Sequence, residues 1–91
     1  MIRSFGDKET ARFFYSGRSR KFASIQSSLK RKLQLLESAK ELQDLASPGG
    51  NHLEALGGDR KGQHGIKVND QYRICFHWEG EPEDVEVVDY H

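Results

Sequence analysis

The sequence predicts a small α+β protein in which two N-terminal helices pack on one face of a mostly antiparallel sheet of three or four strands. Apolar residues recur at intervals of three and four through the first half of the chain, which indicates helices. In the second half they alternate with polar residues, which indicates strands, and turns containing Gly or Pro separate the elements. The expected order of elements is β-α-α-β-β-β.

The first half of the chain is expected to hold one short strand and the helices. Residues 2–5 form the strand, and Asp7 can cap a helix that ends near Tyr15. A longer helix is expected over about residues 24–45, and the turn at residues 48–50 ends it. Its apolar stripe consists of Phe22, Ile25, Leu29, Leu33 and Leu36.

The second half is expected to supply the sheet. Its strand candidates are residues 53–56, 63–68, 72–78 and 85–90. A tight turn at Asn69 and Asp70 joins the second candidate to the third, and an acidic loop over residues 79–84 precedes the last. Strands joined by such short turns pair in an antiparallel manner.

The strand at residues 72–78 orients the side chains that carry chemistry. Side chains alternate along a strand, so Arg73 and Cys75 are expected on the open face of the sheet, away from the helices. An arginine at the centre of an open face is well placed to bind an anion. The alternative is a salt bridge across the ladder to Glu86 or Asp89. The side chains expected to pack under the helices are those of Tyr72, Ile74 and Phe76.

Composition limits the class of protein. The chain has 91 residues, of which 35% are hydrophobic and 31% charged, and we expect a single domain over residues 1–91. The opening residues lack the apolar region of a signal peptide, and no apolar run is long enough to cross a bilayer. Its one cysteine, Cys75, fits a reducing compartment. We therefore expect a cytoplasmic protein with no membrane partner.

Charge is distributed unevenly along the chain although the formal net charge is zero. Residues 1–45 hold ten Lys and Arg against five Asp and Glu, whereas residues 46–91 hold four against nine. A basic half can bind a polyanion or an acidic partner. Solvated helix faces produce the same asymmetry, so charge alone does not decide between these explanations.

Metal binding is not expected. Two of the potential ligands, Cys75 and His77, share one strand face, but the sequence has no second paired ligand motif. Cys75 lies in an apolar strand, where cysteine commonly acts as a small hydrophobe, and His64 is expected to be a buried, hydrogen-bonded core residue. The other potential zinc ligands are His52, His64 and His91.

Four segments together carry a resemblance to a known family. These are Leu56-Gly57-Gly58-Asp59-Arg60-Lys61-Gly62, Ile66-Lys67-Val68-Asn69, Gln71-Tyr72-Arg73-Ile74-Cys75-Phe76 and Val88-Asp89-Tyr90-His91. They resemble the RelE/ParE superfamily and, within it, the HigB-type (host-inhibition-of-growth) toxins of bacterial type II toxin–antitoxin modules. The resemblance covers nearly the whole chain and implies a RelE-like fold. It departs from the family at Glu54 and Gly57, where relatives usually have a histidine and a lysine, so an attenuated activity is expected.

The resemblance implies a ribosome-dependent endoribonuclease that cleaves messenger RNA in the ribosomal A site without a cofactor. Such toxins are neutralised by a helix-turn-helix antitoxin (HigA-like), and the toxin reaches operator DNA only through that complex. Two surfaces can receive the antitoxin, namely the open sheet face or a basic surface. The basic surface comprises Arg18, Arg20, Lys21 and residues 30–32.

Cleavage of RNA by its own 2′-hydroxyl needs a base, a cation for the phosphate and an acid for the leaving oxygen. Arg73 fits the cation, and His91 titrates near neutrality and suits proton transfer. Tyr90 can hydrogen-bond a phosphate or stack on a base, and Asp89 can orient an imidazole. The expected substrate contacts are Arg60, Lys61 and Gln71.

Two other functions remain open from the sequence. Glu54 and Gly57 can mark lost catalysis, in which case the chain is a RelE-fold module that acts as an antitoxin ligand or transcriptional corepressor. A gyrase-directed branch of the superfamily shares the fold and also inhibits growth. The final Tyr90-His91 favours the ribonuclease over both, although these residues can also form an ordinary polar end to an edge strand.

Overall fold

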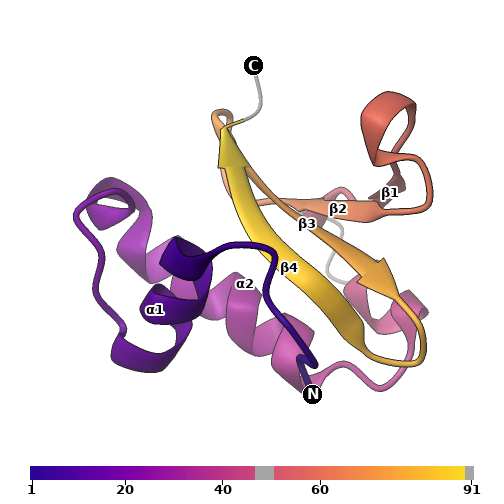
Figure 1. Cartoon of the computed structure of the whole chain (residues 1–91), viewed down its shortest axis with the longest axis horizontal. Coiled ribbons are helices and arrows are strands. Elements are labelled where there is room, and N and C mark those ends of the chain that lie inside the picture. Colours follow the sequence, from indigo (N-terminus) through magenta and orange to yellow (C-terminus); the bar gives the residue numbers. More distant parts are fainter. Residues whose placement is uncertain (47–50, 90–91) are drawn as a thin grey trace.

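The structure, a computed structural model, describes residues 1–46 and 51–89. Its sheet has four strands in the order β1-β2-β3-β4, and every neighbouring pair is antiparallel. Helices α1 and α2 lie together on one side of the sheet, and the turn after β1 lies on the other (Figure 1). The strands are β1 (Glu54–Ala55), β2 (His64–Lys67), β3 (Tyr72–Trp78) and β4 (Pro82–Asp89). The arrangement confirms the predicted α+β class.

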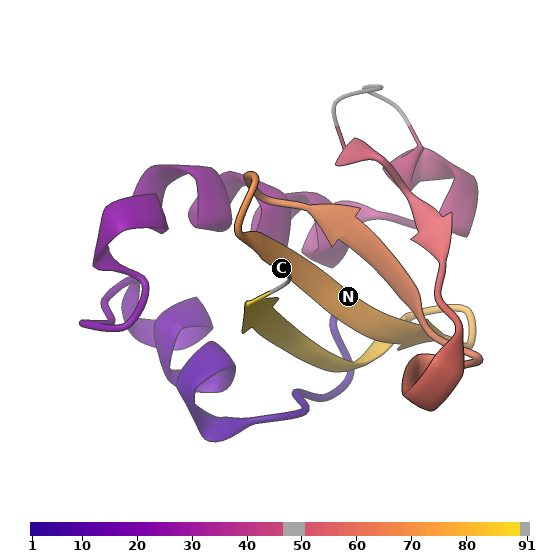
Figure 2. The ribbon, with the colours of Figure 1, turned by 90° about the horizontal axis from the view of Figure 1, so that it is seen from above.

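Helix α1 (Lys8–Ser16) begins and ends as the sequence predicts. Asp7 caps it, because its side chain accepts a hydrogen bond from the Thr10 N–H at 3.3 Å. Gly17 ends it in the left-handed conformation, with φ of 73°, and donates its N–H to Phe13 at 2.7 Å. This short helix stands beside α2 around one end of the sheet (Figure 2).

The second helix is shorter than predicted, and the expectation of one helix over residues 24–45 is wrong. The segment consists of η1 (Ala23–Ile25), α2 (Gln26–Ser38) and η2 (Leu42–Leu45). The backbone becomes extended at Ala39, because the Asp44 carboxylate accepts hydrogen bonds from the N–H groups of Lys40 and Glu41, each at 3.0 Å. These side-chain hydrogen bonds start a new turn, so the helix cannot continue. The turn predicted at residues 48–50 lies outside the described residues.

The predicted first strand, residues 2–5, is also wrong in detail. The chain runs alongside β4 but makes only one isolated parallel bridge, between Phe5 and Val85. Further along β4, the Val87 N–H donates to the buried hydroxyl of Thr10 at 3.0 Å. The N-terminal segment and α1 together therefore cover the outer edge of β4.

Strand β4 begins earlier than predicted, at Pro82, so the acidic loop is shorter than residues 79–84. The pairing with β3 shifts between Cys75 and His77, where β4 carries an extra residue. Asp84 takes a positive φ of 53° in this bulge. The bulge breaks the alternation of side chains, so the sequence pattern predicts only the part of β4 beyond it.

The core lies between the helices and the sheet, as predicted. Ile74 and Phe76 of β3 are fully buried there, and the ring of Tyr72 packs edge-on against Phe22 at 6.0 Å. The α2 stripe contributes Phe22, Ile25, Leu29, Leu33 and Leu36. Neither helix in the described part of the chain has the length and apolar composition needed to cross a bilayer.

Candidate active site

Arg73 lies on the face of the sheet opposite the helices, as predicted, but its ion-pair partner is not the expected one. Its Nη1 is 3.0 Å from Oε1 of Glu54 on β1, so a salt bridge to Glu86 or Asp89 is the wrong expectation for this pair. The Arg73 side chain is 17% exposed and that of Glu54 is 46% exposed. The carboxylate therefore faces solvent while the guanidinium is largely enclosed.

The pairing register explains the partner. Gly65 of β2 stands between Glu54 and Cys75, and it has no side chain to separate β1 from β3 on this face. Arg73 can therefore reach diagonally across β2 to Glu54. A Cβ at Gly65 would lie 3.3 Å from Cδ2 of Leu56, so the Leu56 side chain already fills the space above this glycine.

Arg60 forms the second ion pair on this face. The short helix η4 (Gly58–Arg60) presents it, and its Nη1 lies 2.8 Å from Oε1 of Glu86 on β4. The same nitrogen donates to Oε1 of Gln63 at 3.0 Å. Glu86 is thus already engaged by Arg60, which is a second reason that Arg73 pairs with Glu54.

Cys75 lies between these ion pairs on the face opposite the helices, as predicted, but that face is not open at this position. The side chain is fully buried, close to the charges of the two arginine–carboxylate pairs. Burial raises the pKa of the Cys75 thiol, and the Arg60 guanidinium only partly opposes that effect. Cys75 is therefore a covered packing residue, in agreement with its predicted role as a small hydrophobe.

A small polar pocket of about 180 Å³ opens beside Arg73. Lys67 lies on its wall and pairs with Asp70 at 3.1 Å. The pocket brings an imidazole, an ammonium and a guanidinium together, which is a combination suited to a phosphate group. Its lining residues are His52, Lys67, Asn69, Asp70 and Arg73.

The end of β4 reaches the same part of the sheet. Asp89 pairs with Tyr72 in the ladder, next to the pair formed by Arg73 and Val88. Its Oδ2 accepts a hydrogen bond from Nε2 of Gln71 at 3.0 Å. The structure thus brings Asp89 and Gln71 together at this end of the sheet. Tyr90 and His91, predicted as catalytic residues, lie outside the described residues.

The remaining predicted residues are spread over the surface. Lys61 is exposed after η4, and its side chain makes no hydrogen bond or ion pair with any described residue. In the run at residues 30–32, Lys32 is half-buried and donates to Asn51, so only part of the predicted basic surface faces solvent.

His64 lies on the core face of β2 as predicted, with its ring stacked on Phe76 at 6.3 Å between centroids. The expectation that it is hydrogen-bonded is wrong within the described residues, where its buried Nδ1 has no partner. No group of three or more potential metal ligands occurs in the ranges 1–46 and 51–89.

Sequence reasoning missed two residues around Arg73, namely Glu54 and Lys67, whereas His52 was among the histidines considered as a replacement for the missing proton-transfer group. Glu54 was interpreted only as the loss of a histidine, yet the structure places its carboxylate against the arginine. The signal that could have found it is Gly65, because a glycine in a strand marks a close approach between its neighbours. Lys67 pairs with Arg73 directly across the β2–β3 hairpin. His52 is distant from Arg73 in the sequence, and only the fold brings it to the pocket.

Comparison with known proteins agrees with the α+β fold. Residues 3–91 match the family of RelE-like toxins of the type II toxin–antitoxin system HigB, and the chain belongs to this family. Toxin HigB-1 of Vibrio cholerae serotype O1 is 39% identical over 80 residues, covering 86% of this chain and 84% of that protein. An uncharacterized protein of Haemophilus influenzae is 34% identical over 77 residues, covering 82% of this chain and 76% of its own length. The protein is thus a toxin of a type II toxin–antitoxin module, and its membership implies an antitoxin partner.

Proposed function

We propose that this toxin is a ribosome-dependent endoribonuclease that cleaves messenger RNA in the ribosomal A site and so stops translation and growth. The observation that carries the proposal is the contact between Arg73 and Glu54 beside the polar pocket. At one place on the sheet it supplies a cation that can bind a phosphate and a carboxylate that can accept a proton. Family membership supports a toxic role for this site.

In the proposed reaction the 2′-hydroxyl oxygen attacks the adjacent phosphorus, and the bond to the 5′-oxygen of the next nucleotide breaks. Glu54, whose carboxylate is solvent-accessible, takes the proton of the hydroxyl. Arg73 stabilises the charge that develops on the phosphate oxygens. A group at the end of β4, for which we propose His91 or Tyr90 oriented by Asp89, protonates the leaving oxygen. The products are a 2′,3′-cyclic phosphate and a 5′-hydroxyl.

Relatives usually have a histidine at the position of Glu54. In the proposed reaction the Glu54 carboxylate transfers the proton in place of that histidine. Arg60, Lys61 and Gln71 are proposed to contact the substrate around the scissile linkage. The reaction draws its nucleophile from the RNA and its proton transfers from side chains, so we propose that it proceeds without a metal ion or other cofactor.

The charge of the protein supports the proposed dependence on the ribosome. The net charge is zero, and both Arg60 and Arg73 are engaged by carboxylates, so free RNA has few phosphate contacts to gain. Binding at the A site would supply the orientation and effective concentration that the isolated protein lacks.

The partner we propose is a HigA-like antitoxin with a helix-turn-helix fold. It would neutralise the toxin in the cytoplasm and bring it to operator DNA, which the toxin itself would not contact. Co-expression of the toxin with the small protein from the neighbouring reading frame tests this, because the two should copurify and growth should recover.

The central experiment incubates the purified protein with translating ribosomes and maps the ends of the message. We expect cleavage within the codon in the A site, and we expect it to persist in EDTA. Arg73→Ala should abolish cleavage, whereas Arg31→Ala, which removes an exposed arginine from α2, should not. An intact message at high toxin concentration would reject the proposal.

A second candidate function is a catalytically weak module that acts mainly as antitoxin ligand and corepressor. The observation that favours it is that Glu54 and Glu86 already neutralise the two arginines that a phosphate would need. Growth assays separate the two functions. Growth inhibition that survives both Arg73→Ala and deletion of residues 90–91 would indicate a role other than cleavage.

A further inference from the structure

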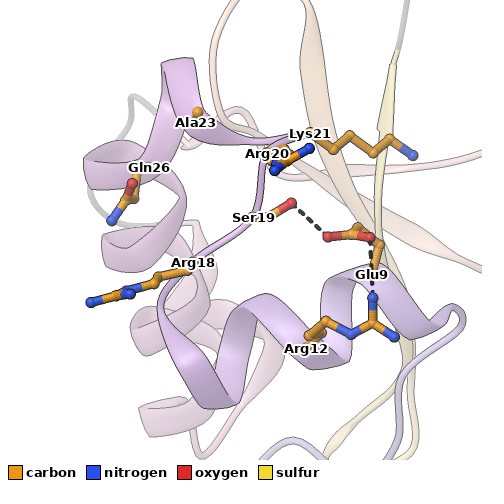
Figure 3. A pocket seen from close by; sticks show the side chains of 8 residues that line it. All are labelled: Glu9, Arg12, Arg18, Ser19, Arg20, Lys21, Ala23 and Gln26. Carbon is orange, nitrogen blue, oxygen red and sulfur yellow. Dashed lines mark hydrogen bonds and ion pairs between the residues drawn. The ribbon is translucent and has the colours of Figure 1, made fainter.

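A hollow on the helical part of the protein lies outside the candidate active site. It has a volume of about 630 Å³ and lies between α1 and the connection to α2 (Figure 3). Four cationic side chains border it, and all four residues are exposed. They are Arg12 from α1 and Arg18, Arg20 and Lys21 from the connection. We call these four residues, with Glu9 and Ser19, the basic pocket.

Glu9 is the one carboxylate among the described residues that line the basic pocket. Its Oε2 accepts a hydrogen bond from the Ser19 hydroxyl at 2.6 Å, and its Oε1 lies 3.9 Å from Nη1 of Arg12. Glu9 therefore ties α1 to the connection. Within residues 1–46 and 51–89, the three cations of the connection form no ion pair. The pocket thus carries an uncompensated positive charge.

The backbone that carries these cations is held in place. Gly17 adopts its left-handed conformation, and its carbonyl accepts a hydrogen bond from Nε2 of Gln26 at 3.0 Å. The Arg18 N–H donates to the Ser16 hydroxyl oxygen at 3.1 Å. A ligand would meet a preformed loop, so little backbone ordering would oppose its binding.

The basic pocket adjoins the end of the sheet that carries the candidate active site. Nζ of Lys21 lies 5.5 Å from the centroid of the Phe22 ring, and Phe22 packs against Tyr72. Tyr72 precedes Arg73 and pairs with Asp89 in the ladder. Arg73 itself faces away from the helices, so a nucleic acid that contacts both Arg73 and the pocket would pass around this end of the sheet.

We propose that the basic pocket binds the phosphodiester backbone of a folded RNA at a point separate from the scissile linkage. Three of its four cations are arginines, whose planar guanidinium groups bind phosphate oxygens in a bidentate manner. An acidic protein segment fits less well, because Ala23 alone offers an apolar side chain among the described lining residues. Protein interfaces depend on buried apolar or aromatic anchors, and phosphate contacts do not. The proposal rests on the proposed function only in taking RNA as the target.

The test uses a fluorescent RNA hairpin whose 2′-hydroxyls are all methylated, so that it can be bound but not cleaved by 2′-oxygen attack. Its dissociation constant is measured by anisotropy over a series of salt concentrations. The test variant is Arg18→Ala/Arg20→Ala, and the matched control is Lys8→Ala/Lys40→Ala, which removes the same charge from exposed positions outside the pocket. Circular dichroism and thermal unfolding check that each variant is folded.

Each phosphate contact contributes about 0.9 to the slope of log affinity against log salt for duplex nucleic acid. We therefore expect the slope to fall in magnitude by about 2 in the test variant and to stay unchanged in the control. Equal slopes in the two variants would overturn the proposal. A competition experiment gives a second way to overturn the proposal. Poly-L-glutamate is added at the same total charge as the RNA. If it displaces the hairpin from the wild-type toxin but not from the test variant, the pocket prefers an acidic protein segment.

This readout does not depend on catalysis. If the test variant and the control have equal salt slopes while the wild type still cleaves message, only the proposal for the basic pocket is rejected. If the slope falls in the test variant but the wild type does not cleave message, the proposed function is rejected and the proposal for the basic pocket stands.

Discussion

Replacing Glu54 with glutamine tests the role of the carboxylate beside Arg73 directly. Glutamine keeps the size of the side chain but removes its charge and its ability to accept a proton. If Glu54 is the general base, Glu54→Gln should lower the rate of message cleavage on ribosomes by roughly 10²- to 10⁴-fold. That factor corresponds to about 3–5 kcal/mol in the activation barrier.

The effect on stability should be far smaller. Glu54 is 46% exposed, so solvent screens its ion pair with Arg73 at 3.0 Å, and the pair should contribute only about 0.5–1 kcal/mol to folding. A large loss of rate with a small loss of stability therefore identifies a chemical role. Single-turnover cleavage on stalled ribosomes measures the rate, and urea denaturation measures the free energy of unfolding.

The matched control is Glu79→Gln, which removes the same charge from the exposed turn before β4 and should leave the rate unchanged. The result that would refute the reasoning is a faster reaction in Glu54→Gln. In that case the carboxylate competes with the substrate phosphate for Arg73, and the toxin is attenuated by its own ion pair.

Three further predictions concern the scaffold. Thr10→Val should destabilise the protein by about 1–3 kcal/mol in urea, because the buried Val87 N–H loses its acceptor, whereas Thr10→Ser should retain most of the stability. Leu56→Ala should open the space above Gly65, the residue that pairs with Cys75, so a disulfide reagent such as DTNB should react faster with the thiol than in the wild type; an unchanged rate would show that Leu56 does not cover it.

The third prediction concerns acid, because hydrogen bonds from two backbone N–H groups hold the pKa of Asp44 below its ordinary 3.8. Its stabilising effect is complete above that value and is lost as pH falls through the lower native pKa. The stability of Asp44→Asn should therefore decline less steeply below about pH 4 in urea titrations.

The fold could be predicted because long-range packing agrees with local patterns in most elements. The cap at Asp7, the left-handed Gly17 and the stripe of α2 each appear in the sequence as local signals, and the structure uses each one. The prediction failed where a local side-chain contact overrides periodicity. Leucines continue in helical spacing to Leu45, but the hydrogen bonds of Asp44 interrupt the helix at Ala39.

The candidate site was less predictable, because its geometry depends on the register of four strands. Alternation along β3 correctly placed Arg73 opposite the helices. It could not show that Gly65 lets the arginine reach Glu54, or that Arg60 occupies Glu86. Both facts depend on how the chain after β1 folds back over the sheet, which no local pattern encodes.

The covered outer edge of β4 bears on how this toxin is made. Contacts join opposite ends of the chain, since the Asp84 N–H donates to the Ser4 hydroxyl across 80 positions and the Val87 N–H donates to the Thr10 hydroxyl across 77. The earliest residues to leave a ribosome must therefore remain unsatisfied until nearly all of the message has been read. Folding that ends with such distant pairings is slow compared with helix formation. The toxin therefore cannot complete its fold while its last strand is still being synthesised.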